Sequence, residues 1–185
     1  LTGAGSLAFY AFTTYMQKFL VNTSGFSKGV ATNISAASLV VYMFAQPLFG
    51  LLGDKIGRTR SIAIAFGGLT LLSYPIMSGI AATDNPYVAL ALVVLALVFL
   101  SGYTAVNAVV KAELFPAHIR ALGVALPYAL ANAVFGGTAE YIALWFKGRG
   151  TESWFYIYVA AGAFIALLTA IRMRDTGATS LIEDD

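Results

Sequence analysis

Six long apolar stretches, separated by short polar gaps, make up most of this 185-residue sequence. They cover residues 4–21, 30–52, 61–82, 87–110, 121–146 and 153–172. About 20 helical residues cross a hydrocarbon core of about 30 Å, so each stretch is long enough to span a bilayer. The runs are continuous rather than alternating, which favours helices over barrel strands. We therefore predict an all-α, polytopic membrane protein that forms a bundle of six transmembrane helices.

The composition fits a chain surrounded by lipid. Hydrophobic residues make up 59% and charged residues 11% of the sequence, whereas soluble domains carry about 25% charged residues. The formal net charge of +2 is small and dispersed, so nucleic acid is not an expected partner. Cysteine is absent, which excludes disulfides and thiol catalysis. No cofactor motif or metal-ligand cluster is present, and we expect neither a cofactor nor a metal.

The domain organisation is simple. Residues 1–174 form one predicted transmembrane domain, and residues 175–185 form a polar cytoplasmic tail. The sequence opens on Leu1 and lacks the basic region and cleavage site of a signal peptide. We therefore expect the first span to be an internal helix and the chain to be a fragment of something longer.

Lysine and arginine between the spans predict the orientation. One side carries Lys55, Arg58, Arg60, Lys111, Arg120, Arg172 and Arg174. The other side carries Lys18, Lys28, Lys147 and Arg149. Seven cations against four predict that the first side, with both ends of the fragment, faces the cytoplasm.

The gap after the second span reads GLLGDKIGRTR, residues 50–60. Gly53 and Gly57 give the backbone freedom that a tight turn between antiparallel helices requires. Asp54 is placed to face the positive end of a neighbouring helix, and Arg58 to bridge to an acidic group. The simpler alternative is a positively charged loop with no specific role.

The gap after the fourth span contains KAELFPAHIRALG, residues 111–123. Pro116 stops the helix, and Glu113 and Arg120 flank the turn as a predicted charge pair. Together with Arg58 they would form one cytoplasmic cluster, whose charges interact strongly at the membrane boundary. A cluster that forms in one state and breaks in another is a gate, so we predict Asp54, Arg58, Glu113 and Arg120 as cytoplasmic gate residues.

These motifs resemble those of the major facilitator superfamily. GLLGDKIGRTR is similar to the signature loop that follows the second and eighth helices of these transporters, and AELFPAHIRALG to the loop after the tenth. The stretches FYAFTTYMQKFLVNTSG and ALPYALANAVFGGTAEY resemble its metabolite–proton symporter branch. The resemblance covers essentially the whole chain, as helices seven to twelve.

The resemblance implies the C-terminal half of a twelve-helix bacterial inner-membrane transporter. The implied activity is proton-coupled symport of a dicarboxylate, α-ketoglutarate, by alternating access, with the missing N-terminal six-helix half as an essential partner. By the same resemblance Asp54 faces the fifth helix, and the proton-coupling residues lie on the first and fourth helices, outside this sequence. An osmolyte symporter for proline or betaine, or a citrate-type symporter, is the alternative within the superfamily.

Polar side chains at bilayer depth are costly and usually face a bundle interior, so they predict the cavity. At about 100° per residue they form stripes on the first, second and fifth spans, whereas the third and sixth spans carry small residues and are expected to be peripheral. On the fourth span Ser101 and Thr104 share one face and Tyr103 and Asn107 another; we favour the second, because its side chains reach further. The predicted substrate-cavity residues are Tyr10, Thr14, Gln17, Lys18, Tyr42, Gln46, Tyr103, Asn107, Tyr128, Asn132 and Glu140.

Two of these residues have competing interpretations. Lys18 lies near the outer end of its span, where it would either extend to the membrane interface or bind an anion. Glu140 would serve as an outer-gate contact, a proton site, a partner for Lys18 or a structural hydrogen-bonding group.

Two other classes of protein are weighed against a transporter. A membrane-embedded enzyme is disfavoured because the sequence has one histidine and no G-x-S-x-G motif. A unit that serves only in assembly would have no use for the charged gate loops.

Overall fold

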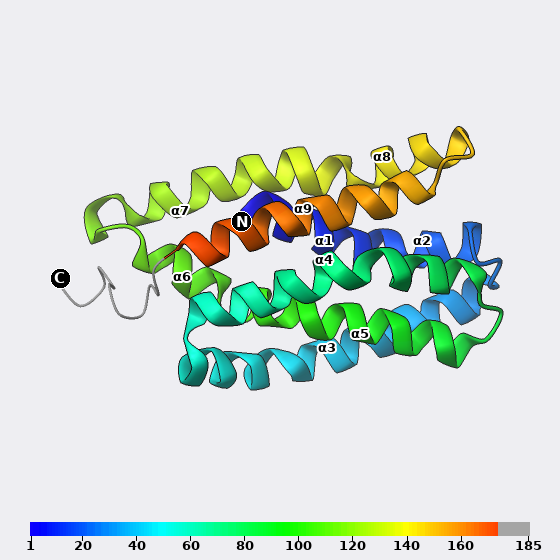
Figure 1. Ribbon diagram of the computed structural model, residues 1–185, viewed down its shortest axis with the longest axis horizontal. Coiled ribbons are helices and arrows are strands. Elements are labelled where there is room, and N and C mark those ends of the chain that lie inside the picture. Colours follow the sequence, from blue (N-terminus) through cyan, green and yellow to red (C-terminus); the bar gives the residue numbers. More distant parts are fainter. Residues whose placement is uncertain (174–185) are drawn as a thin grey trace.

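The computed structural model describes residues 1–173, which fold into helices that run along one common axis (Figure 1). In chain order these are α1 (Thr2–Phe12), α2 (Thr14–Asn22), α3 (Lys28–Ile56), α4 (Arg58–Ala82), α5 (Pro86–Thr104), α6 (Asn107–Glu113), α7 (Ala117–Ala131), the π-helical turn η1 (Asn132–Gly136), α8 (Gly137–Gly148) and α9 (Ser153–Arg172). The all-α class predicted from the apolar stretches is confirmed. The predicted tail, residues 175–185, lies outside the described residues.

Five segments are long and apolar enough to cross a membrane: α3, α4, α5 with α6, α7 through α8, and α9. They coincide with the second to sixth predicted spans. The first predicted span is not one continuous helix, because α1 ends at Phe12 and α2 begins at Thr14. The Thr13 hydroxyl donates a hydrogen bond of 2.5 Å to the Phe9 carbonyl, and such bonding by threonine competes with the helical pattern and bends helices.

Two further interruptions fall within predicted spans. The fourth predicted span is broken at residues 105–106, between α5 and α6. The fifth contains η1, and π-helical turns of this kind occur frequently at functional sites. The turn between α3 and α4 depends on Gly57, whose φ of 98° is one that residues with a Cβ rarely adopt.

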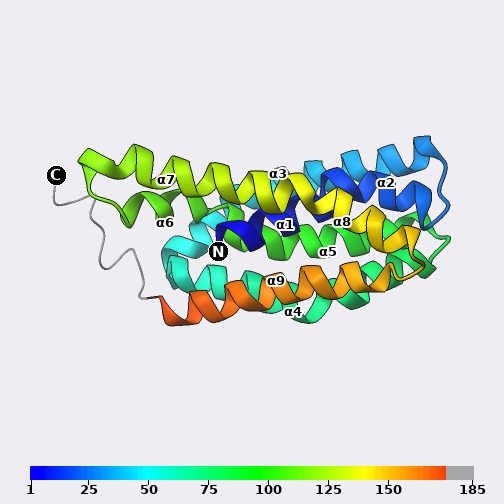
Figure 2. The ribbon, with the colours of Figure 1, turned by 90° about the horizontal axis from the view of Figure 1, so that it is seen from above.

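The packing divides the bundle into a tight part and a looser part. α4 packs extensively against α9 and α5, and α3 packs against α5. Large buried side chains, including Phe19, Phe66 and Phe155, fill this part. The long segment from α7 through α8 lies along one edge of the bundle (Figures 1 and 2). It meets the rest mainly through α1, and α7 has no buried residue.

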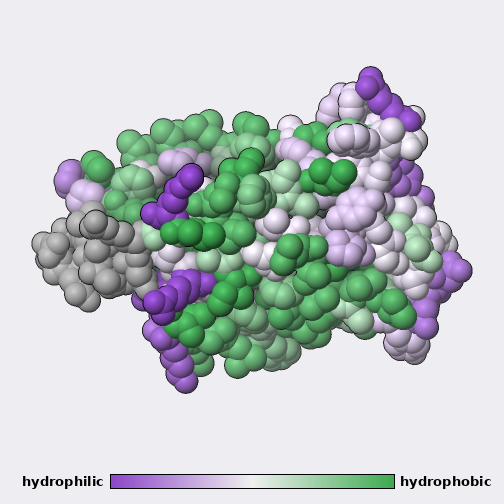
Figure 3. Space-filling model, viewed as in Figure 1, coloured by the Kyte–Doolittle hydropathy of each residue, from purple (hydrophilic) through white to green (hydrophobic). Residues whose placement is uncertain are grey.

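The surface agrees with a membrane environment. Apolar residues cover the middle of the molecule, and the strongly hydrophilic residues gather toward its two ends (Figure 3). The α3–α4 and α6–α7 turns lie at one end, and the α2–α3, α4–α5 and α8–α9 turns lie at the other (Figure 1).

Candidate functional site

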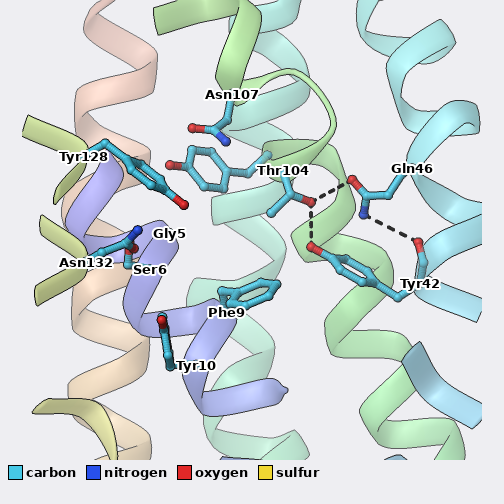
Figure 4. Close-up of a pocket in the computed structure, with 11 residues that line it drawn as sticks. Gly5, Ser6, Phe9, Tyr10, Tyr42, Gln46, Thr104, Asn107, Tyr128 and Asn132 are labelled. Atoms are coloured by element: carbon cyan, nitrogen blue, oxygen red, sulfur yellow. Dashed lines mark hydrogen bonds between the residues drawn. The ribbon is translucent and has the colours of Figure 1, made fainter. Parts of the chain in front are cut away.

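A cavity of about 260 Å³ opens between α1, α3, α5, α6, α7 and η1 (Figure 4). Its lining residues are Gly5, Ser6, Phe9, Tyr10, Tyr42, Gln46, Tyr103, Thr104, Asn107, Tyr128 and Asn132. All of them are uncharged, and most carry a hydroxyl or amide group. Neither α4 nor α9 contributes to the lining, and these helices occupy the spans that we expected to be peripheral. Seven predicted cavity residues meet here: Tyr10, Tyr42, Gln46, Tyr103, Asn107, Tyr128 and Asn132.

One wall of the cavity, which we call the α3–α5 wall, consists of Tyr42, Gln46 and Thr104, with the buried Ser101 behind them. The Tyr42 hydroxyl donates to Thr104 Oγ1 at 2.7 Å, and Thr104 donates to Gln46 Oε1 at 3.1 Å (Figure 4). Gln46 Nε2 then donates to Ser101 Oγ at 3.3 Å, and Ser101 to the Leu97 carbonyl at 2.9 Å. These polar groups are joined in one continuous network, so the fold itself uses most of their hydrogen-bonding capacity.

Thr104 corrects the sequence prediction for the fourth span. We favoured the face of Tyr103 and Asn107 over the face of Thr104, but all three residues line the cavity. The reason is the break between α5 and α6, which changes the direction of the chain between Thr104 and Asn107. An uninterrupted helix would have kept the two faces apart.

The opposite side, which we call the α6–α7 wall, consists of Asn107 and Tyr128, and Lys111 lies behind it, outside the lining. Asn107 Oδ1 is buried and has no hydrogen-bond partner in the part of the chain that the structure describes. The Tyr128 side chain is 48% exposed, and its hydroxyl forms no hydrogen bond with residues 1–173. The Lys111 ammonium lies over the Tyr128 ring, 4.6 Å from the ring centroid. This wall therefore holds polar groups that the described fold leaves without partners.

α1 closes the cavity between the two walls. Ser6 donates a hydrogen bond to Asn132 Oδ1, which ties α1 to η1 (Figure 4). Gly5 lets α1 approach α5, because a Cβ there would lie 2.1 Å from the Tyr103 ring. Sequence analysis missed Gly5, Ser6, Phe9 and Thr104. Ser6 carried a usable signal, since it lies one helical turn before Tyr10 on the same face.

The other four predicted cavity residues, Thr14, Gln17, Lys18 and Glu140, lie toward the far end of the bundle. Thr14 and Glu140 line another, smaller cavity of about 130 Å³, which shares Tyr10 with the first. Lys18 forms an ion pair with Glu140, so α2 is linked to α8. Gln17 donates to Thr32 Oγ1 at 2.8 Å. Among the roles considered for Glu140, the structure contains the contact with Lys18.

The predicted cytoplasmic gate residues divide into two groups. Arg58 forms an ion pair with Glu113, whose side chain is only 4% exposed, and a longer contact of 3.4 Å with Asp54. Within residues 1–173 the predicted pair between Glu113 and Arg120 does not form, and that prediction was wrong. Glu113 turns inward toward α4, whereas Arg120 Nε donates to the carbonyls of Ala112 and Phe115 at 3.1 and 3.0 Å. Basic side chains commonly satisfy the terminal carbonyls of a helix in this way.

The described residues contain no group of three or more histidine, cysteine, aspartate or glutamate side chains that could hold a metal ion. The hydroxyl and amide groups that line the cavity can act as hydrogen-bond donors and acceptors toward a small polar solute.

The sequence matches the Major Facilitator Superfamily over residues 1–182. The chain belongs to this superfamily. The resemblance inferred from the two loop motifs is thereby confirmed. Membership of the Major Facilitator Superfamily identifies the chain as part of a multi-pass membrane transporter and not of an enzyme.

Curated relatives within the superfamily differ widely in similarity. The alpha-ketoglutarate permease of Escherichia coli (strain K12) is 50% identical over 177 residues, which are 95% of this chain and 41% of the relative. The glycine betaine/proline/ectoine/pipecolic acid transporter OusA of Dickeya dadantii is 28% identical over 94% of the chain and 34% of its own length. The proline/betaine transporter of E. coli (strain K12) is 27% identical over the same shares. The chain thus spans about two-fifths of the first relative, and no solved structure gave a significant match.

Proposed function

We propose that this chain is the C-terminal, six-helix half of a proton-coupled symporter that carries α-ketoglutarate, a dicarboxylate, across the inner membrane of a bacterium. The observation that carries the proposal is the cavity of about 260 Å³, where hydroxyl and amide groups from α1, α3, α5, α6, α7 and η1 converge inside an apolar bundle. Buried polar groups at this depth are costly unless they serve a solute pathway. The 50% identity to an alpha-ketoglutarate permease supports the choice of substrate.

In the proposed mechanism the substrate binds near the bilayer midplane, between this cavity and six further helices that lie outside the sequence. The two halves rock about the substrate, so that the cavity opens to each side of the membrane in turn. The seven-to-four distribution of cations supports a cytoplasmic position for the α3–α4 and α6–α7 turns. The groups that couple transport to protons belong to the other half.

Two ion pairs are proposed as the gates of this cycle. Arg58 with Glu113 and Asp54 would hold the cytoplasmic ends of α4 and α6 together in one state. At the opposite end, Lys18 with Glu140 would hold α2 against α8 in the other. The two pairs differ in burial, since Glu113 is 4% exposed whereas the Lys18 and Glu140 side chains are 55% and 35% exposed.

The proposal is tested by uptake of labelled α-ketoglutarate into vesicles that contain the full-length transporter. An imposed proton gradient, acid outside, should drive accumulation, and a protonophore should abolish it. Uptake that ignores the gradient would contradict proton coupling.

A symporter for proline or betaine is the second candidate. The observation in its favour is the ring-rich lining, with Phe9, Tyr10 and Tyr128 among its residues, because aromatic faces bind quaternary ammonium groups. The same vesicles distinguish the two candidates. Uptake of betaine without uptake of α-ketoglutarate would replace the dicarboxylate proposal.

A further inference from the structure

A dicarboxylate needs cationic partners, and the cavity described above is lined by none. Its lining contains no lysine, arginine or histidine among the described residues. Carboxylates are held best by charge-assisted hydrogen bonds, which are roughly twice as strong as neutral ones. The question is therefore which cation of this chain lies within reach of the cavity.

Lys111 differs from the other lysines of the chain in its surroundings. Lys28 and Lys55 are exposed to the exterior of the bundle. Lys18 and Lys147 are paired with Glu140 and Glu152. Lys111 is partly buried, and it forms no ion pair within residues 1–173. A partly buried ammonium without an ion-pair partner is available to bind an anion.

The position of Lys111 directs its charge toward the cavity. It lies one helical turn after Asn107 on α6, so both side chains project from the same face. Its ammonium rests over the Tyr128 ring, 4.6 Å from the centroid, and Tyr128 itself lines the cavity. A lysine that only extended to the membrane interface would point along the helix end and away from α7.

A second cavity connects Lys111 to the first. It measures about 250 Å³ and is lined by Lys111 and by Leu1 and Thr2 at the start of α1, together with Tyr103 and Asn107, which also line the first cavity. The two cavities therefore adjoin at these shared residues. Asn107 Oδ1 is buried there without a hydrogen-bond partner in the described chain. The donor that a carboxylate would need is Asn107 Nδ2, which likewise forms no hydrogen bond within residues 1–173.

We propose that Lys111 binds one carboxylate of the substrate where the two cavities adjoin, with Asn107 and Tyr128 as neutral hydrogen-bond donors beside it. The inference rests on the proposed function, because it assumes a dicarboxylate substrate. It assigns a cationic anchor to this half of the transporter, where the sequence had led us to expect the main cation in the other half. When a carboxylate binds, the Lys111 ammonium exchanges part of its cation–π contact with Tyr128 for a stronger, charge-assisted hydrogen bond to the carboxylate.

Competition in the transport assay tests this role. The full-length transporter is reconstituted in vesicles, and the uptake of labelled α-ketoglutarate is measured in the presence of an unlabelled competitor. The competitors are α-ketoglutarate itself and its two mono-amides, in each of which an uncharged amide replaces one carboxylate. Lys111→Gln should reduce the preference for the dicarboxylate over one mono-amide by about tenfold, as expected for a lost charged partner of about 1.4 kcal/mol. Lys111→Arg should keep most of the preference, and the exposed control Lys55→Gln should keep all of it.

Chemical protection of the unaltered transporter provides a measurement that does not depend on how the variants fold. Saturating α-ketoglutarate should slow the modification of Lys111 by an amine-reactive reagent several-fold and leave Lys55 unaffected, as read by mass spectrometry. The inference about Lys111 is wrong if Lys111→Gln still prefers α-ketoglutarate over each of the two mono-amides as strongly as the unaltered transporter does. It is also wrong if α-ketoglutarate does not protect Lys111 from modification. In either case the proposed function stands. If the unaltered transporter takes up no α-ketoglutarate, the proposed function fails, and the inference fails with it.

Discussion

The two walls of the cavity contain similar polar groups and use them differently. On the α3–α5 wall, Tyr42, Thr104 and Gln46 bond to one another and, through Ser101, to the backbone. On the α6–α7 wall, Asn107 Oδ1 and the Tyr128 hydroxyl have no partner within residues 1–173. Polar groups that are satisfied within a fold stabilise it, whereas groups without partners remain available to a ligand. Under the proposed function, the first wall would support the site and the second would bind the substrate.

The walls also differ in how they are held in place. The α3–α5 wall belongs to the tightly packed part of the bundle. The segment from α6 to α8 packs loosely, and among the described residues a few polar links connect it to the rest of the bundle, including Lys147 of α8, which donates to the Asn22 carbonyl of α2 at 2.8 Å. The links also include the Arg58–Glu113 ion pair, the Ser6–Asn132 hydrogen bond and the Lys18–Glu140 ion pair. A wall held by a few polar links can move during a transport cycle while the other wall stays fixed.

The largest effect is expected from breaking the most buried link. Arg58→Gln leaves the Glu113 carboxylate, 4% exposed, without its cation, and removing one partner of a buried pair costs roughly 3–5 kcal/mol. Glu113→Gln should cost less, because Arg58 is 25% exposed and keeps Asp54. Thermal melting of the detergent-purified, full-length transporter gives the order. A Tm for Glu113→Gln at or below that of Arg58→Gln would contradict this account.

A change where the walls meet comes next. The Cβ in Gly5→Ala would lie 2.1 Å from the Tyr103 ring, and this ring is buried against Phe66 with centroids 4.9 Å apart. Overpacking of this kind costs about 1–3 kcal/mol. We expect a lower Tm and weaker transport for Gly5→Ala, and no change for the control Gly29→Ala, which has open space around it. Equal behaviour of the two variants would show that α1 is free to shift away from α5.

Thr104→Val tests whether the α3–α5 wall is structural. The substitution keeps the shape of the side chain but removes the hydroxyl between Tyr42 and Gln46. Leaving buried polar groups without partners costs about 1–3 kcal/mol, and we place this variant at the lower end because Gln46 keeps Ser101. The loss is measured as a decrease in Tm. An unchanged Tm with strongly weakened substrate binding would reverse the assignment of the two walls.

The smallest effect on stability is expected at the Lys18–Glu140 link. Both side chains are well exposed, at 55% and 35%, and exposed ion pairs contribute at most about 1 kcal/mol. Lys18→Gln should leave the Tm nearly unchanged, with Lys28→Gln as an exposed control. If the pair acts as an outer gate, Lys18→Gln should still alter the transport rate, and the charge-swapped double variant Lys18→Glu/Glu140→Lys should restore it. Rates that match the unaltered transporter in every variant would remove this pair from the gate.

The sequence predicted well those features that depend on long, uninterrupted apolar runs. Spans such as 153–172 were predicted closely because a long apolar run in lipid has few alternatives to a helix, since every backbone polar group must be satisfied internally. The stripes on individual spans also identified most of the residues that meet in the cavity. They did so because polar side chains at depth are too costly to face lipid.

The helix breaks and individual partners could not be predicted in the same way. The interruptions at Thr13 and at residues 105–106 leave no clear mark in the apolar pattern, because a threonine that bonds the carbonyl four residues earlier also occurs within unbroken helices, as at Thr70 and Thr169. The break after α5 is what brings Thr104 into the cavity. Arg120 is a similar case. Glu113 and Arg120 are close in sequence, yet Glu113 pairs with Arg58 from α4, which is distant along the chain.

The difference between the walls is tested most directly by measuring substrate affinity and thermal stability for Asn107→Ala and Thr104→Val in the full-length transporter. The lost hydrogen bond to a charged ligand should raise the Kd of Asn107→Ala for α-ketoglutarate about tenfold or more, without lowering the Tm, because the fold does not use this amide. Thr104→Val should lower the Tm and change the Kd by less than about threefold. An Asn107→Ala variant that binds α-ketoglutarate normally but melts early would contradict the account, because the α6–α7 wall would then support the fold and not the substrate.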